Sequence, residues 1–482
     1  MTTSNPIRTF DVIIIGTGVA ASTVAYECTS KNWKVAIIDS RPFGGTCAIR
    51  GCDPKKVLVG ATEVIDWNNR MEDKGVVVID SKKEVHIDWQ KLMFFKRSFT
   101  EPVPKNREEN FSNAGIAAFH GRAHFVDHST VKVNATIQQQ QREEEGRTND
   151  HMLTGRYHVI ATGAKPVDLN IPGVEYITTS DQFLELDNLP KQIVFIGGGY
   201  ISFEFAHIAA RAGAKKVTIL HRGKTPLGHF DPDLVDRLVQ ASHDLGIDIQ
   251  LNTEVQKIEK KSSGALVVSA YLRGENHNSI KIQTDMVVHG AGRVPEIDDL
   301  NLEAAGIEYD SRKGIKVNEY LQSVSNPAVY AAGDAAGSVG PQLTPVATYE
   351  GQIVADNLLK GNHIKTNFKG VPSVVFTIPP LASVGLQEQA AREQGIHIKT
   401  NYVKDTSSWY SSRRIGEKYS GFKVLVEEGE SGRILGAHIL GQNAEEVINI
   451  FAIAIQLGIS ADKLKEAIFS YPTNTSNISY ML

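Results

Sequence analysis

Two strand–glycine-turn–helix patterns and a β-rich C-terminal stretch predict an α/β fold, with two Rossmann-like dinucleotide-binding domains followed by a C-terminal α+β domain. The patterns lie at 10–22 and 192–206, and the β-rich stretch begins near residue 368. With 482 residues, the chain is too long for one hydrophobic core. Roughly three domains are therefore expected.

The composition excludes several classes of protein. A net charge of −4, with 22% charged residues, does not favour nucleic acid or an anionic membrane as a partner. No apolar run approaches the roughly 20 residues that span a bilayer, and the first residues, "MTTSNPIRTF", lack an apolar signal core. Three cysteines do not suit a secreted disulfide scaffold. We therefore expect a soluble, cytoplasmic protein.

The first pattern, "FDVIIIGTGVAAS", is an apolar strand, a glycine turn and a helix of small residues. Gly16, Gly18 and Ala21 take the small positions of G-x-G-x-x-G/A, where the backbone can approach a pyrophosphate at a helix N-terminus. The next strand, "KVAIID", ends in Asp39, about 20 residues downstream, where a carboxylate can bind a ribose hydroxyl. This stretch predicts a dinucleotide site.

The second pattern, "QIVFIGGGYISFEFA", repeats the arrangement. Its three small residues are Gly197, Gly199 and Ser202. The following strand ends in His221 and Arg222, with Lys224 close behind, where an acid would select an unphosphorylated ribose. A cationic pair suits a 2′-phosphate better, so we expect NADPH rather than NADH. A solvated surface turn is the alternative interpretation.

A third element, "AVYAAGDAAG", is a strand of small residues that ends in Gly333 and Asp334. A carboxylate at a strand end can accept hydrogen bonds from a sugar or ribityl hydroxyl. Without further context, Asp334 would more often cap a helix.

The stretch "GGTCAIRGCDPKK" places Cys47 and Cys52 five positions apart. A zinc site needs about four ligands, and no second pair or histidine cluster matches. On a regular helix five positions rise about 7.5 Å, beyond the usual span of a disulfide, about 4.4–6.8 Å between Cα atoms. A bridge therefore requires an irregular turn, which Gly51 and Pro54 would help to form. Strained bridges are readily reduced, so we expect a reactive pair and not a staple.

In these motifs the chain resembles the FAD-dependent pyridine nucleotide–disulfide oxidoreductases, the group of glutathione reductase, dihydrolipoamide dehydrogenase and mercuric reductase. The motifs run in the family's order: the first glycine turn, "GGTCAIRGCDPKK", "ATGAKP", "GGGYISFE", "GAGRVP", "AAGDAAG" and "LTPVA". "GCDPKK" and the cationic second pattern look most like the glutathione reductase branch.

The resemblance implies an enzyme that passes electrons from NADPH through FAD to a redox-active Cys47–Cys52 disulfide and on to a small-molecule acceptor, with a low-molecular-weight disulfide favoured. Cys52 would lie against the flavin, and Cys47 would meet the substrate. Lys55 and Glu204 look like the family's ion pair beside the flavin, and Tyr200 like the side chain that covers the nicotinamide pocket. A surface ion pair and a packing aromatic are their alternative interpretations.

The remaining site residues also follow from the resemblance. Those implied to bind FAD are Gly16, Gly18, Ala21, Asp39, Gly45, Thr46, Thr162, Gly163, Gly333, Asp334 and Thr344. Those implied to bind NADPH are Gly197, Gly199, Tyr200, Ser202, Arg222, Lys224 and Arg293. No resident metal is expected.

The C-terminal segment departs from the family. Disulfide reductases there carry "HPT" and a nearby Glu, and this chain reads "IFSYPTNTSNISYML", with Tyr471 at the His position. A phenol is a poor base at neutral pH, and loss of a general acid costs roughly 10²–10⁴ in rate where one is needed. Mercuric reductases also lack the His, but they carry a C-terminal cysteine pair. This chain has none, and Cys28 is expected in the core.

Several acceptors therefore remain open: a disulfide with a good leaving thiol, a metal ion, or a quinone. Tyr471 or another residue could also have taken over the acid role. Two other classes are a non-catalytic interaction module and a diaphorase or NADPH oxidase that does not use the disulfide. Intact Cys47, Cys52, Lys55 and Glu204 argue against the interaction module.

We expect an FAD-binding domain at 8–165 with a return segment at 296–365, an NAD(P)H-binding domain at 166–295, and a dimerisation domain at 368–482. The polar run "IQQQQREEEGRTNDH" (137–151) is too hydrophilic for a core and is expected to be an exposed extension or loop. The helix "AEEVINIFAIAIQLG" is apolar nearly all round, which suggests a buried interface. The resemblance implies a homodimer in which Tyr471 lies opposite the other subunit's Cys47.

Overall fold

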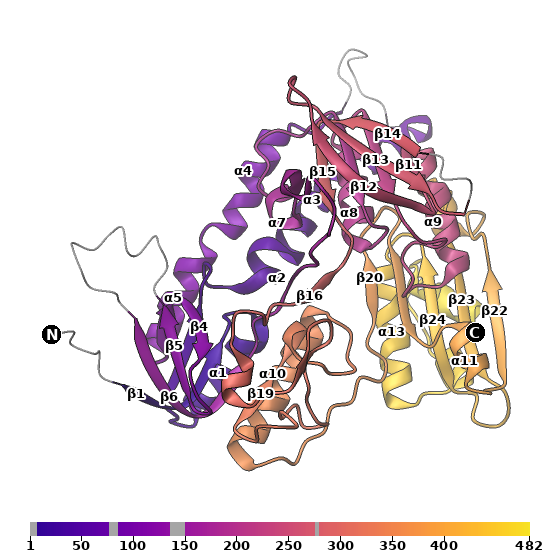
Figure 1. Ribbon diagram of the computed structural model, residues 1–482. Helices are drawn as coiled ribbons and strands as arrows, with labels where there is room; N and C mark the ends of the chain where they lie inside the picture. The colour runs from indigo at the N-terminus through magenta and orange to yellow at the C-terminus, as the bar shows by residue number, and fades with distance from the viewer. Residues whose placement is uncertain (1–6, 77–84, 135–149, 275–278) are drawn as a thin grey trace. The chain divides into compact units, whose positions relative to one another are not determined.

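The computed structural model describes residues 7–76, 85–134, 150–274 and 279–482 (Figure 1). The chain forms two compact units, each assembled from three segments. The first unit is built from 1–54, 97–167 and 293–368, and the second from 55–96, 168–292 and 369–482. The three-domain division expected from the sequence stays a prediction. Most of the polar run at 137–151 lies outside the described residues.

The first unit is organised around a seven-stranded sheet (Figure 1). Its strands are β1 (Arg8–Ile15), β2 (Val35–Asp39), β3 (Ala117–His120), β4 (Arg122–Phe125), β5 (Thr130–Asn134), β6 (His151–Ile160) and β19 (Val329–Ala331). The order is β3-β2-β1-β6-β5-β4, with β19 also paired to β6. The pairs among β3, β2, β1, β6 and β19 are parallel, and β4 and β5 add antiparallel pairs.

The apolar run in β1 is explained by burial on both faces of this sheet. Val12 and Ile14 belong to one hydrophobic cluster, Ile13 and Ile15 to another, and all four are buried. Parallel strands covered on both faces require such continuous apolar runs. The helices of this unit are α1 (Val19–Ser30), α2 (Gly45–Arg50), α5 (Val103–Asn113) and α10 (Thr344–Lys360). Its short strand pairs are β7 (Ala164–Pro166) with β16 (Arg293–Pro295), and β17 (Tyr309–Asp310) with β18 (Gly314–Ile315).

The second unit contains a five-stranded parallel sheet in the order β11-β10-β9-β15-β8. These strands are β8 (Ile177–Thr178), β9 (Gln192–Ile196), β10 (Lys216–Leu220), β11 (Ile247–Gln250) and β15 (Met286–His289). A separate antiparallel sheet holds β12 (Thr253–Lys260), β13 (Leu266–Leu272) and β14 (Ser279–Thr284). The helices are α7 (Ser180–Phe183), α8 (Tyr200–Arg211) and α9 (Pro232–Asp244). Two longer helices, α3 (Cys52–Met71) and α4 (Trp89–Thr100), have residues in both units.

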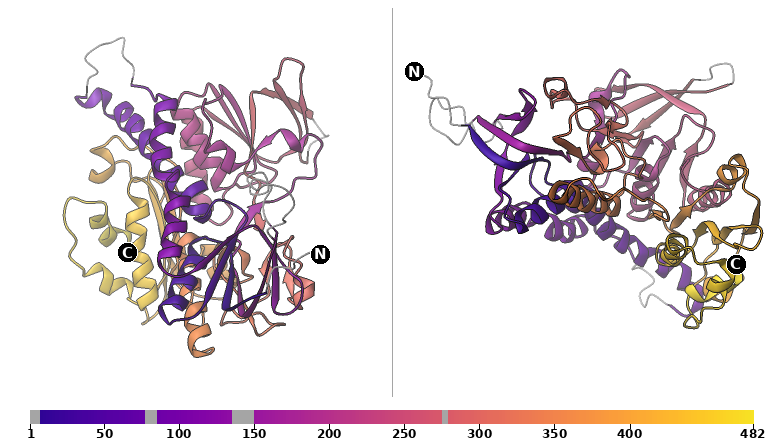
Figure 2. Two further views of the ribbon diagram at one scale, coloured as in Figure 1. Left: turned by 90° about the vertical axis from the view of Figure 1, so that its left-hand side faces the viewer. Right: turned by 90° about the horizontal axis from the view of Figure 1, so that it is seen from below.

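The C-terminal part of the second unit is an antiparallel sheet with helices, in the order β20-β21-β24-β23-β22. Figure 2 shows its strands and helices gathered together in orange and yellow. The strands are β20 (Ser373–Val375), β21 (Leu381–Gly385), β22 (Ile398–Val403), β23 (Gly421–Glu427) and β24 (Ile434–Leu440). The helices are α11 (Glu388–Glu393), α12 (Tyr410–Arg413), α13 (Ala444–Leu457), α14 (Ala461–Lys465) and α15 (Ile478–Met481).

Helix α13 packs one face against this sheet and leaves apolar residues on the other. Val447, Ile448 and Phe451 are buried, whereas Ile453 and Leu457 are exposed. An exposed apolar surface of this kind is typical of an interaction site. No helix within the described ranges combines the length and apolar character needed to cross a bilayer.

Candidate functional site

The first glycine turn is held in shape by Asp39 at the end of β2. Its Oδ2 accepts hydrogen bonds from the Thr17 amide, at 3.0 Å, and from the Thr17 hydroxyl, at 2.6 Å. Gly16 has a φ of +113°, and a Cβ there would collide with the carbonyl oxygen of Ala161. Gly18 is the N-cap of α1. The turn therefore needs small residues for its backbone path.

A second helix begins beside this turn, because Gly45, the first residue of α2, packs directly against Gly18. Gly45 has a φ of +73°, and a Cβ on it would collide with the Gly18 Cα. The Gly44 amide donates to the Thr17 hydroxyl at 3.1 Å. The starts of α1 and α2 thus lie together, an arrangement suited to a pyrophosphate. Thr46 follows in the first turn of α2.

The predicted irregular turn between the two cysteines is present. Helix α2 ends at Arg50, Gly51 has non-helical dihedrals (φ −142°, ψ −111°), and α3 begins at Cys52. Pro54 lies in the first turn of α3. A Cβ on Gly51 would lie 3.0 Å from the Thr46 carbonyl oxygen, so the bend favours glycine.

Cys47 and Cys52 are thiols in this structure, and their side chains are within hydrogen-bonding reach. The hydrogen bond with Cys52, together with burial, raises the pKa of the Cys47 thiol, while the Thr344 hydroxyl lowers it. The Cys52 Sγ lies 3.4 Å from the Thr344 Oγ1. One hydroxyl at the start of α10 therefore serves both sulfurs. Cycling of the pair between thiol and disulfide stays a prediction.

Two carboxyl groups, those of Asp334 and Glu350, belong to or contact the segment at 333–338 of the same unit. Asp334 is in a short 3₁₀ helix at 333–335, where burial raises its pKa and Arg293 lowers it. Glu350 on α10 accepts hydrogen bonds from the Gly333 amide, at 2.7 Å, and from the Ser338 hydroxyl, at 2.6 Å. Burial raises the pKa of Glu350 to about 7. Glu350 was not predicted from the sequence.

The structure fits a dinucleotide at the first turn. The buried Thr162 hydroxyl has no hydrogen-bond partner among the described residues, and Gly163 (φ +77°) faces open space. Burial raises the pKa of Asp334, against the opposing effect of Arg293. A buried hydroxyl without a partner, a carboxyl with a raised pKa and two adjoining helix starts would suit the polar groups of FAD.

Arg293, predicted to bind the nicotinamide nucleotide, lies on β16 in the first unit. Its guanidinium donates to the carbonyl oxygen of Ala164 on the neighbouring strand β7 and acts on Asp334. The structure therefore groups Arg293 with the predicted FAD residues. Its nucleotide role stays a prediction.

The second glycine turn repeats the close packing of the first. Gly197 has a φ of +104°, and a Cβ on it would collide with the Gly290 carbonyl oxygen. Gly199 is the N-cap of α8, and Tyr200 begins the helix with 49% of its surface exposed. Ser202 is buried against Gly290, so α8 closely approaches the end of β15.

His221, one residue past the end of β10, was not predicted to hold this turn. Its Nδ1 accepts a hydrogen bond from the Gly198 amide at 3.0 Å, and its Nε2 donates to the Thr225 carbonyl oxygen at 3.0 Å. Arg222 and Lys224 are exposed, and within the described part of the chain neither forms an ion pair. Asp39 occupies the corresponding position of the first pattern. That correspondence could have identified His221 as the residue that holds the second turn.

The structure contains an ion pair between Lys55 on α3 and Glu204 on α8. The Lys55 Nζ lies 2.8 Å from the Glu204 Oε1, and Glu204 is only 2% exposed. The Phe376 amide donates to the same oxygen at 2.8 Å, and Lys55 lies over the Phe376 ring, 4.6 Å from its centroid. Glu204 thus holds the Lys55 ammonium through an oxygen that the Phe376 amide also binds. The role of this pair beside a flavin stays a prediction.

Tyr471 is 77% exposed, and its ring lies near that of Tyr410, with 6.3 Å between the centroids. Cys28 is buried in α1, as expected from the sequence, and burial raises its pKa to about 12.

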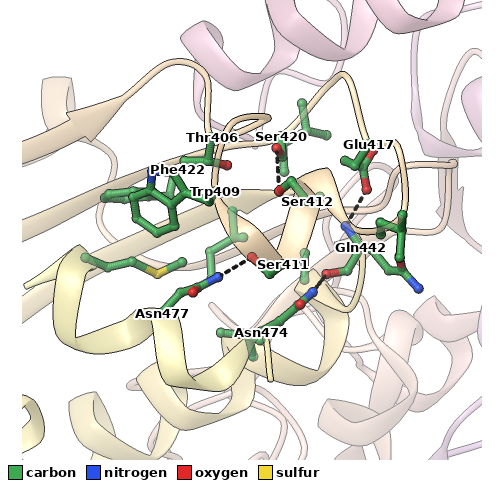
Figure 3. A pocket seen from close by; sticks show the side chains of 18 residues that line it. Thr406, Trp409, Ser411, Ser412, Glu417, Ser420, Phe422, Gln442, Asn474 and Asn477 are labelled. Atoms are coloured by element: carbon green, nitrogen blue, oxygen red, sulfur yellow. Dashed lines mark hydrogen bonds between the residues drawn. The ribbon is translucent and has the colours of Figure 1, made fainter. Parts of the chain in front are cut away.

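A cavity of about 40 Å³ lies in the C-terminal part of the second unit (Figure 3). Figure 3 shows the Asn477 side-chain amide donating to the Ser411 hydroxyl, at 2.7 Å, and the Gln442 backbone amide donating to the Glu417 carboxylate, at 3.0 Å. Burial raises the pKa of Glu417 to about 7. The cavity contains none of the site residues predicted from the sequence.

Two family models match the chain. One, described as "Pyridine nucleotide-disulphide oxidoreductase", matches residues 10–351. The other, described as the dimerisation domain of the same family, matches residues 371–481.

Curated relatives include a mercuric reductase from Bacillus cereus, 31% identical over 96% of this chain and 69% of that protein. A glutathione reductase from Burkholderia cepacia is 33% identical over 96% of both. Among solved structures, the Cu(II) complex of the HOCl-induced flavoprotein disulfide reductase RclA from Escherichia coli is similar, with a TM-score of 0.84 and 27% identity. That comparison covers 98% of this chain and 99% of the other.

Proposed function

This chain belongs to the pyridine nucleotide–disulphide oxidoreductase family, a family of FAD-dependent enzymes that use NAD(P)H, and from that premise we propose that it reduces a low-molecular-weight disulfide at the expense of NADPH, through FAD and the pair Cys47/Cys52. The observation that carries the proposal is the grouping of both cysteines with the Thr344 hydroxyl, 3.4 Å from the Cys52 Sγ and lowering the pKa of Cys47, in the unit that also holds the first glycine turn. A cytoplasmic location, expected from cysteine usage, is part of the proposal.

The cofactor is proposed to bind along the first glycine turn, where its pyrophosphate would meet the starts of α1 and α2. Asp39 would receive its ribose, and Asp334 and Thr162 would take its remaining polar groups. When bound, FAD supplies two-electron transfer between a nicotinamide and a thiol pair. The protein's own part is to bind, orient and protonate.

The chain's sulfurs would complete the exchange with the acceptor. A thiolate at Cys47 attacks one sulfur of the acceptor disulfide and releases the first thiol. Cys52 then attacks the mixed disulfide at Cys47, which forms the internal disulfide and releases the second thiol. The hydrogen bond with Cys52 and burial raise the pKa of Cys47, and the Thr344 hydroxyl opposes that rise, which favours the attacking thiolate.

Tyr471 sets a condition on the acceptor. Its phenol can donate a hydrogen bond but is a weak acid–base group at neutral pH. An acceptor whose leaving thiol is already acidic needs little help from a general acid. We therefore propose an activated disulfide, and the match to the dimerisation domain, which indicates a homodimer, would bring Tyr471 to the thiol pair of a second copy.

NADPH is proposed over NADH because the turn after β10 presents Arg222 and Lys224 and carries no carboxylate where an NAD-binding domain would have one. Steady-state rates with each coenzyme test this choice. A kcat/KM that favours NADH would contradict it.

Anaerobic titration with NADPH tests the relay. The thiolate–flavin pair should produce a long-wavelength absorption band, and Cys52→Ser should abolish it. Cys47→Ser is the matched variant, because it leaves the Cys52 sulfur in place and should retain a band. Flavin that simply bleaches with one equivalent of NADPH in the wild type would refute the use of the disulfide.

Reduction of metal ions is the second candidate, favoured by the likeness to the mercuric reductase over 96% of the chain. Stopped-flow mixing of two-electron-reduced enzyme with glutathione disulfide, other small disulfides, Hg(II) and quinones separates the acceptors. The true acceptor should reoxidise the enzyme fastest and should require Cys47. A quinone that reacts equally well with Cys47→Ser would indicate diaphorase activity.

A further inference from the structure

We propose that His221 is a positioning residue for the nucleotide turn at 197–199 and acts as an acid-sensitive latch: its neutral imidazole holds the turn, and protonation releases it. The inference rests on the proposed function in one respect, because it takes the nucleotide to bind at this turn. Two consequences follow. Nucleotide binding weakens in acid, and the ribose is recognised by Arg222 and Lys224 and not by the imidazole.

The hydrogen bonds define a single form of the ring. The Gly198 amide is a donor, so the Nδ1 that it meets at 3.0 Å must be an acceptor. The Thr225 carbonyl is an acceptor, so the Nε2 at 3.0 Å must carry the proton. Only the neutral Nε2–H tautomer of His221 satisfies both partners.

The first glycine turn shows what this contact does. There Asp39 accepts a hydrogen bond at 3.0 Å from the amide of Thr17, the residue between the first two glycines. Gly198 occupies the same place in the second turn, and its amide goes to His221. Both turns are thus tied to the end of the following strand by the same backbone amide.

The carboxylate and the imidazole differ in the number of hydrogen-bond acceptor positions that they leave for a ligand. A carboxylate such as Asp39 has further lone pairs that can receive a ribose hydroxyl. The neutral imidazole of His221 has one acceptor nitrogen, and the turn uses it. His221 therefore holds the turn as the carboxylate does in the first pattern. Unlike the carboxylate, it has no acceptor left for a ribose hydroxyl and so does not select an unphosphorylated ribose.

The ring is packed against the backbone of two glycines. A Cβ on Gly198 would lie 2.7 Å from the imidazole Cγ, and a Cβ on Gly223 would lie 2.7 Å from Nε2, so two glycines enclose the ring. The backbone of His221 is also fixed. Its amide donates to the Gln250 carbonyl at 2.9 Å, and its carbonyl accepts from the Thr253 amide at 2.8 Å.

The surrounding charges favour the neutral ring. Burial lowers the pKa of His221, and Arg222 lowers it as well, against the opposing effect of the carbonyl that Nε2 binds. Of the other charged groups nearby, Lys224 is exposed and Glu254 on β12 is engaged by Arg273 at 3.3 Å. A proton added at Nδ1 would face the Gly198 N–H, and the hydrogen bond would be lost. Because the pKa is depressed, the latch is closed at neutral pH and opens as the pH falls.

A direct charge effect would have the opposite sign. If the imidazolium contacted a phosphate of the nucleotide, acid would tighten binding, because a second cation would join Arg222 and Lys224. The two nitrogens are already bonded to the protein, so the latch predicts weaker binding instead. The direction of the pH dependence distinguishes the two.

The experiment is calorimetric titration of oxidised holoenzyme with NADP⁺ between pH 8 and pH 5. The wild-type dissociation constant should be flat near neutrality and should then rise by up to tenfold per pH unit relative to His221→Asn. The Asn side chain can accept from Gly198 but does not titrate. Using one ligand for both proteins cancels the titration of its own 2′-phosphate, whose pKa is near 6.

Controls separate the possible failures. His229→Asn replaces an exposed histidine of the same loop and should keep the wild-type profile. Flavin content and melting temperature check folding, and His221→Gln serves as a second non-titrating variant. Parallel profiles for wild type and His221→Asn, or tighter binding in acid for the wild type, would overturn the latch. Absence of NADP⁺ binding at every pH would instead overturn the proposed function.

A carboxylate variant tests the second consequence. His221→Glu can hold the Gly198 amide with one oxygen and offer the other to a ribose hydroxyl. The ratio of NAD⁺ to NADP⁺ dissociation constants should fall by at least tenfold. An unchanged ratio would show that His221 plays no part in leaving the ribose to Arg222 and Lys224.

Discussion

Glu350 should make the stability of the enzyme depend on pH, and Glu350→Gln should remove that dependence. Burial raises the pKa of this carboxyl from its ordinary value of 4.5 to about 7. Below pH 4.5 the folded and unfolded chains both hold the proton, so there is no cost. As the pH rises towards 7, the unfolded chain releases the proton and the folded chain retains it, so stability falls.

The size of the effect follows from this difference. At about 1.4 kcal/mol for each pKa unit, ionisation of Glu350 costs the folded state about 3 kcal/mol above pH 7. A glutamine keeps an acceptor for the Gly333 amide and a donor for the Ser338 oxygen, but it carries no charge. Glu350→Gln should therefore raise the melting temperature at pH 8 by several degrees and leave it unchanged at pH 4.5.

The assay is thermal unfolding with excess FAD from pH 4.5 to pH 8.5, followed by flavin fluorescence. Glu101→Gln, which removes an exposed carboxyl of the same unit, is the matched control and should follow the wild type. If the curves for wild type and Glu350→Gln stay parallel across this range, the carboxyl does not titrate as its burial implies.

Three further substitutions test the site. Gly45→Ala puts a Cβ into the Gly18 backbone and should lower the flavin content of the purified protein at least tenfold, measured as the ratio of flavin to protein absorbance. Thr344→Val removes the hydroxyl beside the two sulfurs. In a spectrophotometric pH titration, the long-wavelength band of this variant should appear at a higher pH than that of the wild type. An unchanged midpoint would contradict the role of the hydroxyl. Tyr471→His restores a group that titrates near neutrality and should raise turnover with glutathione disulfide by about 10²–10⁴ if protonation of the leaving thiol is limiting; equal turnover would mean that it is not.

Local patterns predicted the parts of the fold that depend on backbone geometry. The glycine spacings at 16–21 and 197–202 correspond to the two turns, and Gly51 marks the break between α2 and α3. These predictions succeed because a turn, a helix start or a break is determined by a few adjacent residues.

The parts that sequence reasoning missed depend on contacts between distant residues. Nothing near His221 indicates that its imidazole would bind the Gly198 amide, 23 positions away. Glu350 likewise acquires its raised pKa from burial and from its fit to the 333–338 loop. Arg293 lies in the first unit because its strand β16 pairs with β7, a long-range pairing that its own motif does not reveal.

The break at Gly51 lets two cysteines that are close in sequence approach each other, which limits how much a disulfide between them affects folding stability. A bond between Cys47 and Cys52 would close a ring of only six residues. Ring closure this small restricts an unfolded chain by about 2 kcal/mol, against about 4.7 kcal/mol for a 100-residue ring. Making and breaking this bond at every turnover therefore changes the free energy of unfolding by less than half of what a bond across a 100-residue ring would.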